Sequence, residues 1–474
     1  MKFTETARRL MVRFLTLKRL IVDVNPFAAK LKATRKSSSL KHKPMILKKA
    51  LFLGLAVLPF TPSFAQKHIQ QKEVERIIRT LAADDMMGRQ TFTPGIEKAA
   101  DFISAEFKKI GLKPLPGDSD FKQEFKMFRL KPQEAEVEIN GKEIAPENFF
   151  YSTSSREVEW EENAPEPVFI GENDDFRQGI NKARQQQKDV LVMVHPKHQS
   201  MFNRYANYFR QASPVTEVGK GPTMVFVLSP LTEVRSFEVE IENEVEEMSL
   251  ANVAGMIPGK RKNEYVVFSG HHDHIGIQKP VEGDSIANGA DDDASGTTAV
   301  ITLAKHFKKQ RKPERTLIFV TFTAEEIGGY GSQYFSKQLN PDEIVAMFNI
   351  EMIGKGSKFG PNTAYITGFD KSDFGPLLQG AVKGTPYSFH PDPYPSQNLF
   401  YRSDNATLAR LGVPAHTISS VQIDQDKLYH SVDDEVESLD LAHMTNMIKA
   451  IAMGAKDFVD GKRTPSRVDK TQVQ

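Results

Sequence analysis

Strand-like and helix-like runs alternate along the chain after residue 250, and this alternation constrains the fold more than any other feature. Apolar runs predict strands at 265–269, 316–323, 344–352, 363–368 and 415–419, and periodic segments predict helices at 296–309, 331–338, 404–411 and 439–459. Strands separated by helices favour a sheet that is covered by helices on both faces. We therefore expect an α/β fold with a mixed, mostly parallel central sheet flanked by helices.

The chain also divides into parts of different character. Its 474 residues are too many for one compact domain, since domains with a single core seldom grow beyond about 250–300 residues. Helical segments at 71–84 and 95–111 and a strand at 121–128 precede short alternating runs that are rich in glutamate. We expect residues 66–128 and 251–461 to form the main domain, residues 129–250 an inserted β-rich subdomain, and residues 462–474 a loose tail.

The first 65 residues have the pattern of an export signal. Residues 1–44 carry twelve Lys/Arg against two Asp/Glu, and Met45 opens a segment with two lysines, an apolar run at 50–60 and the small-x-small triplet that ends at Ala65. Such a segment is typical of a secretory signal peptide, here at about 45–65, and its apolar run is too short to span a membrane. We expect residues 1–44 to be a basic extension, Met45 to be the translation start, and the protein to be exported, periplasmic or secreted.

Composition excludes several classes of protein. From residue 66 onward the chain has 48 Lys/Arg and 59 Asp/Glu, so nucleic acid is not an expected partner. The chain has no cysteine, which excludes disulfides, thiolate metal sites and a cysteine nucleophile. A serine enzyme of the α/β-hydrolase type would need G-x-S-x-G at a strand-to-helix turn, and no suitably placed motif is present.

Ligand-type side chains follow the predicted strands directly. Four loops that leave apolar strands present His271-His272-Asp273-His274, Glu325-Glu326, Glu351 and Leu428-Tyr429-His430, and a fifth loop carries Asp291-Asp292-Asp293 ahead of a helix. Ligands of open α/β sheets gather beyond the carboxyl ends of the strands, so these side chains are expected to converge. Histidines and carboxylates without sulfur suit Zn²⁺, and Co²⁺ or Mn²⁺ are compatible with the same set.

The motifs GHHDHIG, NGADDDASG, FTAEEIGG, FNIEMIG and LYHSVDD, in this order, resemble those of the co-catalytic dizinc aminopeptidases. That family includes bacterial leucyl aminopeptidase and glutamate carboxypeptidase. The stretch at 81–112 is similar to the family's N-terminal part, so the resemblance covers about 66–128 and 251–461. It implies the zinc-exopeptidase fold, with the insert in the place where many members carry a protease-associated domain.

The resemblance also implies a role for each motif residue. Two zinc ions are expected, with the ligands His271, Asp292, Glu326, Glu351 and His430, of which Asp292 bridges the two ions. Glu325 is the expected general base, and Asp273 is expected to orient His271. Glu351 stands where the family usually has aspartate, which lengthens one ligand arm. The family often has a cis peptide after the bridging aspartate, here Asp292–Asp293.

Other residues near the motifs are candidates for the substrate side. Tyr429 precedes a ligand and is a candidate donor to the oxyanion of the transition state. The segment YRSDNAT resembles the family's SDH segment, with asparagine in place of the histidine, and makes Tyr401, Arg402 and Asp404 substrate candidates. His272 and His274 are interpreted as structural residues of their loop.

Peptide hydrolysis at neutral pH needs an activated water, an electrophile at the carbonyl group and a proton for the leaving amine. Two metal ions about 3.5–4 Å apart and a neighbouring carboxylate can supply these. We therefore expect a zinc metallopeptidase that acts on peptides, with an aminopeptidase favoured. A carboxypeptidase or dipeptidase, a glutaminyl cyclase-like enzyme on the same scaffold and a non-catalytic binding protein are the alternatives. The sequence indicates no oligomeric state.

Overall fold

The computed structural model describes residues 68–161, 165–210 and 213–473. The basic extension and the signal peptide expected within residues 1–65 lie outside the described residues. Within the described ranges, no helix combines the length and the apolar character that are needed to cross a membrane.

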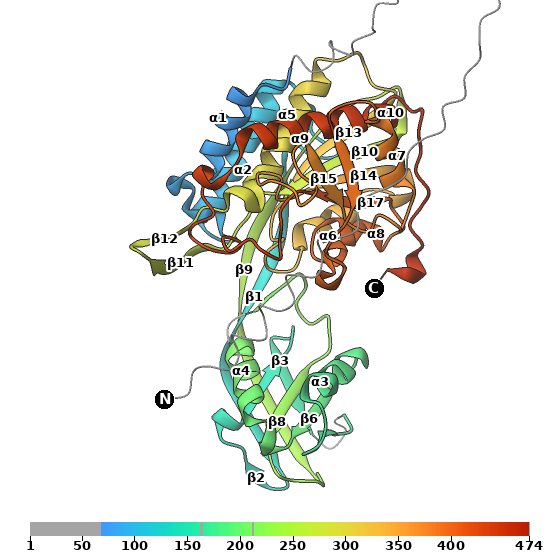
Figure 1. Ribbon diagram of the computed structural model, residues 1–474. Helices are drawn as coiled ribbons and strands as arrows, with labels where there is room; N and C mark the ends of the chain where they lie inside the picture. The colour runs from blue at the N-terminus through green and yellow to red at the C-terminus, as the bar shows by residue number, and fades with distance from the viewer. Residues whose placement is uncertain (1–67, 162–164, 211–212, 474) are drawn as a thin grey trace, which may run out of the picture. The chain divides into compact units, whose positions relative to one another are not determined.

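An eleven-stranded mixed sheet organises the fold (Figure 1). Its spatial order is β16 (Ser388–Pro391), β15 (Thr363–Ile366), β17 (Ala415–Ser419), β14 (Ile344–Ile350), β10 (Arg261–His271), β13 (Arg315–Phe322), β9 (Phe237–Ile257), β1 (Lys122–Ile139) and β2 (Lys142–Glu143). Strands β17, β14, β10 and β13 are parallel, whereas β9 and β1 join antiparallel; β4 (Glu157–Trp160) also pairs with β9, and β7 (Ser213–Val215) with β1. The expected α/β class with helices around a central sheet is confirmed.

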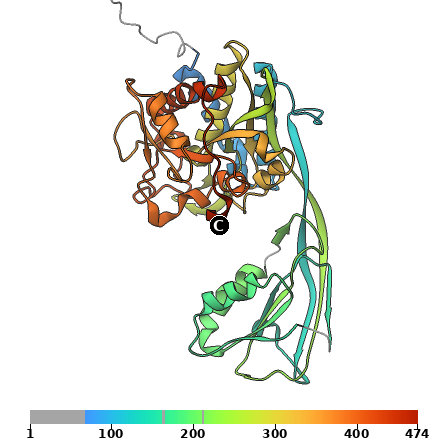
Figure 2. The same ribbon diagram turned by 90° about the vertical axis from the view of Figure 1, so that its right-hand side faces the viewer.

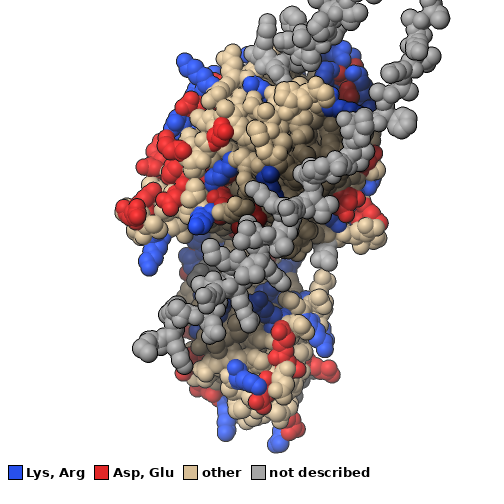
Figure 3. All heavy atoms as spheres, viewed as in Figure 1, with Lys and Arg blue, Asp and Glu red and all other residues tan. Residues whose placement is uncertain are grey.

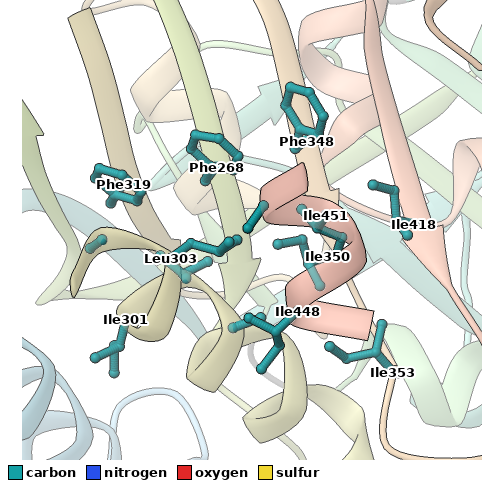
Figure 4. Close-up of a cluster of buried hydrophobic side chains, with 14 of the residues drawn as sticks. Phe268, Ile301, Leu303, Phe319, Phe348, Ile350, Ile353, Ile418, Ile448 and Ile451 are labelled. Atoms are coloured by element: carbon teal, nitrogen blue, oxygen red, sulfur yellow. The ribbon is translucent and has the colours of Figure 1, made fainter. Parts of the chain in front are cut away.

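Helices cover both faces of the parallel strands. One face packs against α1 (Gln71–Leu81), α2 (Pro94–Ile110), α5 (Gly296–Lys308), α7 (Phe374–Ala381), α9 (Leu441–Gly454) and α10 (Lys456–Val459), and the other against α6 (Tyr330–Ser336) and α8 (Asn405–Ala409). Successive strand side chains alternate between the two faces. Phe268, Phe319 and Phe348 of neighbouring strands therefore meet on the first face, where they pack toward α5 and α9 (Figure 4).

A hairpin that the sequence did not predict separates two of the motifs. Strands β11 (Gly276–Val281) and β12 (Asp284–Ala287) form a two-stranded sheet between the GHHDHIG and NGADDDASG segments. Its residues carry no alternation of apolar and polar side chains, and Pro280 lies inside the first strand. Periodicity therefore gives no strand signal here, because the hairpin is largely exposed.

The segment 129–250 contains a second sheet and two helices. Its sheet has the order β3 (Phe149–Ser152), β8 (Met224–Leu228), β6 (Val190–Val194) and β5 (Val168–Ile170), and the helices are α3 (Phe176–Gln185) and α4 (Gln199–Phe209). Strands β5, β6 and β8 coincide with strand-like runs of the sequence, whereas β3 was not predicted. The helices bury Ile180 and Phe202 on one face of the sheet, whereas Trp160 and Val239 cover the other. The two helices were not predicted, although Phe176, Ile180 and Ala183 of α3 have helical spacing.

Strands β1 and β9 lie side by side along their length (Figure 2) and place glutamates opposite one another. The register pairs Glu134 with Glu242, Glu136 with Glu240 and Glu138 with Glu238, and β4 adds Glu157 and Glu159. Such like-charged cross-strand pairs destabilise a sheet. On the face of the molecule seen in Figure 3, by contrast, charged side chains of both signs are interspersed.

Candidate metal centre

The five residues expected to bind metal converge at the carboxyl ends of the central strands. His271 ends β10, Glu326 follows β13, Glu351 follows β14, Asp292 lies in the turn η4 (Ala290–Ser295), and His430 lies in the loop after β17. Together with His274, they form two groups whose donor atoms lie within 4.8 Å of one another: His271, Asp292 and Glu351, and His274, Asp292, Glu326 and His430. The groups share Asp292, so the arrangement can hold two metal ions.

Asp292 turns one carboxylate oxygen toward each group. Its Oδ1 lies 3.2 Å from His271 Nε2, and its Oδ2 lies 3.3 Å from His430 Nε2. Glu326 Oε2 is 3.0 Å from the same His430 nitrogen. The aspartate is 2% exposed, and this geometry is what a bridging ligand requires.

His274 lies in the second donor group, although the sequence suggested a structural loop residue. Its Nδ1 is 2.8 Å from Glu326 Oε1 and 3.9 Å from Asp292 Oδ2. The available signal was the crowding of three histidines into four residues directly after a buried strand. Spacing alone did not reveal which of them face the carboxylates.

The donor set fits a metal such as zinc. Glu351 Oε2 is buried and has no hydrogen-bond partner, although buried polar atoms are nearly always satisfied. Imidazole nitrogens and carboxylate oxygens around two adjacent positions, without sulfur, match the ligands that zinc takes in catalytic sites. The residues that would hold one ion are His271, Asp292 and Glu351, and those for the other are His274, Asp292, Glu326 and His430.

Charge and burial oppose one another at this centre. Burial alone would raise the pKa of Asp292, yet hydrogen bonds with His271 and His430 hold that pKa well below its usual range. Burial likewise opposes protonation of His430, but Asp292 and Glu326 raise its pKa to about 10. Burial raises the pKa of Glu351 to about 7 and that of Glu325 well above its usual range. The protein alone thus leaves several buried carboxyl groups without a full countercharge.

Asp273 contacts both sides of the site. His271 Nδ1 lies 3.1 Å from the backbone oxygen of Asp273 and 3.7 Å from its carboxylate. The carboxylate instead accepts hydrogen bonds from the backbone N–H groups of Glu325 and Glu326, at 3.1 and 3.3 Å. Asp273 therefore fixes the Glu325-Glu326 turn as well as lying beside the imidazole.

The neighbours of Asp292 also hold loops in place. The Asp292–Asp293 peptide is cis, as the resemblance implied. Asp293 accepts hydrogen bonds from the backbone N–H groups of His271, Gly296 and Met352. Its side chain thus joins three of the segments that carry the donors.

Arg89 is a site-supporting residue that sequence reasoning missed. Its guanidinium is fully buried and donates to the backbone carbonyls of Leu81, His272, Asn288 and Gly289. It thereby ties the loop of His271 to the loop of Asp292. The signal was its place in the N-terminal stretch that resembles the dizinc family.

The substrate candidates have different positions. Arg402 and Tyr429 line a pocket beside Glu351, the Arg402 Nη2 donates to Tyr429 Oη at 3.4 Å, and the Tyr429 ring stacks on His430. Tyr401 instead donates to the carbonyl of Gln472 near the chain end. Asp404 is 2% exposed and has no hydrogen-bond partner for either carboxylate oxygen.

Asn405, where the resembling segment has histidine, is part of a buried polar network. It accepts a hydrogen bond from Thr417 Oγ1 at 2.7 Å and donates to the carbonyl of Phe400 at 3.0 Å. Thr417 in turn accepts from Asn349, which donates to Ser403 as well. This network lies beneath the pocket and explains the amide as a packing residue.

Known sequences resemble part of the chain. A probable leucine aminopeptidase of Trichophyton verrucosum is 30% identical over 209 residues, which are 42% of this chain and 55% of the relative. Leucine aminopeptidase 1 of Ajellomyces capsulatus is 32% identical over 214 residues, which are 42% of this chain and 53% of the relative. The chain therefore spans about half the length of the curated relatives it matches.

Among solved structures, an aminopeptidase from Aneurinibacillus sp. strain AM-1 superposes with a TM-score of 0.49 at 19% identity, over 86% of this chain and 97% of that one. A zinc aminopeptidase from Bacillus subtilis gives a TM-score of 0.49 at 16% identity, over 86% and 99%. Residues 252–455 match the sequence model of peptidase family M28. This family match confirms, for residues 252–455, the resemblance drawn from the motifs.

Proposed function

We propose that this protein is a zinc-dependent exopeptidase, and most specifically an aminopeptidase. The observation that carries the proposal is the pair of donor groups that share Asp292, with the partly buried Glu325 in the same loop as Glu326. The names of the curated relatives, leucine aminopeptidases, support the choice of substrate end.

The chemistry that two zinc ions supply when bound is polarisation of a carbonyl group and acidification of water. Glu325 takes a proton from the attacking water and passes it to the amine that leaves. Burial raises the pKa of the Glu325 carboxyl group well above its usual range, which makes the carboxylate a stronger base toward the proton that it accepts. Asp273 holds the backbone of Glu325 and so sets the direction of the carboxylate.

Tyr429 and Arg402 are proposed to act on the substrate. The Tyr429 hydroxyl lies at the pocket edge and donates a hydrogen bond to the oxygen that becomes negative in the transition state. Arg402 holds this hydroxyl and adds positive charge beside it. The side chain next to the cleaved bond enters the pocket formed by these two residues and by Tyr365, Val421 and Ile423.

Three further statements belong to this proposal. The peptidase body comprises residues 66–128 and 251–461, with residues 129–250 as an insert and residues 462–474 as a tail. The protein is exported, on the strength of the signal-peptide pattern at about 45–65. Peptides are the substrates, and two zinc ions, which Co²⁺ or Mn²⁺ can replace, are the cofactors.

The test uses one peptide in three forms: with free ends, with an acetylated N-terminus and with an amidated C-terminus. The purified protein is incubated with each form, with and without a chelator, and mass spectrometry identifies the products. An aminopeptidase shortens the free and the amidated forms from the N-terminus and spares the acetylated form, and the chelator stops the reaction.

Other outcomes point to the alternatives. Shortening of the acetylated form from the C-terminus would reverse the substrate polarity and support a carboxypeptidase. A peptide that begins with glutamine and loses only ammonia would support a glutaminyl cyclase-like enzyme. Binding of zinc with no change in any peptide would contradict the exopeptidase and support a binding protein.

A further inference from the structure

Lys355 lies behind the metal centre, in contact with carboxylates from two other loops. Its Nζ is 2.8 Å from Asp426 Oδ2, 3.2 Å from Asp434 Oδ1 and 3.8 Å from Asp291 Oδ2. The lysine side chain is 15% exposed, and those of Asp291 and Asp434 are fully buried. A lysine is seldom buried unless it is paired, so this position calls for a physical reason.

The three loops that meet at Lys355 are loops that carry metal donors. Lys355 itself follows Glu351 by four residues, and Asp291 precedes Asp292. Asp426 and Asp434 lie on either side of His430. One ammonium group therefore joins the three segments that carry Glu351 of the first donor group, the shared Asp292, and His430 of the second donor group.

Hydrogen bonds extend this link to the backbone of the shared ligand. Asp434 Oδ2 accepts from the N–H groups of Asp291 and Asp292 at 3.0 and 3.1 Å. Asp291 Oδ1 accepts from the N–H of Gly354 at 2.7 Å. The path from the ammonium group through one carboxylate to the Asp292 backbone is thus continuous.

A second path leads to His430. While Oδ2 of Asp426 faces Lys355, its Oδ1 accepts from the N–H of Leu428 at 2.9 Å and closes the turn before Tyr429. His430 adopts a left-handed backbone conformation with φ 55°, which is uncommon for a residue other than glycine and must be held by its surroundings.

We propose that Lys355 is a positioning residue that sets the distance between the His430 loop and the Asp292 loop, and thereby the affinity for the metal that the two loops share. This inference rests on the dimetal function proposed above. Removal of groups that orient metal ligands typically weakens metal binding by about 10–100-fold, and we expect an effect of this size.

The experiment compares the full-length protein with four variants. Lys355→Met removes the charge and keeps a side chain of similar length, and Lys355→Arg restores a cation. Asp426→Asn leaves Lys355 in place but weakens its link to the turn before His430. Lys358→Met is the matched control, since Lys358 is an exposed lysine of the same loop that contacts the Tyr394 ring instead.

Zinc dissociation constants are measured by competition with a chromophoric chelator, and the unfolding temperature of each metal-free protein is measured separately. Lys355→Met and Asp426→Asn should weaken one of the two sites about 10–100-fold, whereas Lys355→Arg should recover most of the affinity and Lys358→Met should keep it. A residue that only stabilised the fold would lower the unfolding temperature and leave the zinc constants of the folded protein unchanged.

If Lys355→Met binds zinc with the dissociation constants of the wild type, the inference is overturned and the proposed function stands. If Lys355→Met does not fold, the same result in Asp426→Asn has this meaning. A weakened site that Lys355→Arg fails to restore would also count against a positioning role of the cation. A wild-type protein that binds no zinc would overturn the proposed function together with this inference.

Discussion

Acid should destabilise the metal-free protein in part through His272, and the effect can be calculated from its surroundings. This side chain is fully buried and lies in the chain between the donor residue His271 and Asp273. Burial, together with the positive charge of Arg89, lowers its pKa from 6.5 to about 3. The folded protein therefore holds His272 neutral under conditions in which the unfolded chain protonates it.

The sign follows from proton binding. Because the folded-state pKa is depressed, the stability that neutral His272 contributes is fully present above pH 6.5 and is lost as the pH falls toward 3. One pKa unit corresponds to about 1.4 kcal/mol, so at pH 5.0 the loss is about 2 kcal/mol and at pH 7.5 it is close to zero.

His272→Met removes the titrating ring and fills a similar volume. We expect the free energy of unfolding of the variant, relative to the wild type, to rise by about 2 kcal/mol between pH 7.5 and pH 5.0. Urea unfolding in the presence of a chelator, followed by circular dichroism, measures it at both pH values. The value at pH 7.5 reports the packing cost and serves as the internal control, and His271 and His430 titrate in both proteins.

An equal difference between variant and wild type at the two pH values would refute this reasoning, because it would mean that His272 is protonated to the same extent in the folded and unfolded states.

Further predictions concern the catalytic centre and the insert. Glu325→Gln should keep both metals and lower kcat by about 10²–10⁴-fold; near-normal turnover would exclude Glu325 as the base. His430→Ala should reduce the zinc content from two to one per chain by elemental analysis, and retention of both would contradict its role as a ligand. Glu240→Lys, which places a cation opposite Glu136 and Glu159, should raise the urea midpoint at low salt and less at high salt, and a lowered midpoint at low salt would argue against repulsion across the strands. Chelation should lower the unfolding temperature, since about 1,000-fold excess of free zinc over Kd adds about 4 kcal/mol, and an unchanged temperature would speak against a tightly held metal.

The central strands were predictable because strands that are buried on both faces have continuous apolar runs in the sequence. Every residue of β13 is buried, and its neighbours on the chain change character abruptly at both ends. Glu325, Glu326 and Glu351 were recognisable for the same reason, since charged side chains directly after buried strands must either meet partners or bind ions. The structure brings these residues together as expected.

Where periodicity was weak, prediction failed. The exposed hairpin β11–β12 carries little apolar pattern, so only its contacts with the rest of the chain define it. Helices α3 and α4 do have apolar residues at helical spacing, but the strand-like runs around them led us to expect only strands in the insert. Asn405 and Tyr401 came from one segment, yet one is buried in a polar network and the other points to the chain end.

The sequence by itself determined the kinds of atoms available for the site and the strands that carry them, because residue types and buried strand patterns are local properties. Only the tertiary structure decided that His274 joins the metal donors and that Arg89 connects the His271 loop with the Asp292 loop. It also decided that Lys355 contacts carboxylates of the Asp292 and His430 loops. The physical reason is that loop side chains have no fixed period. Their directions are set by hydrogen bonds and ion pairs between residues far apart in the chain, such as Asp434 and the backbone of Asp292.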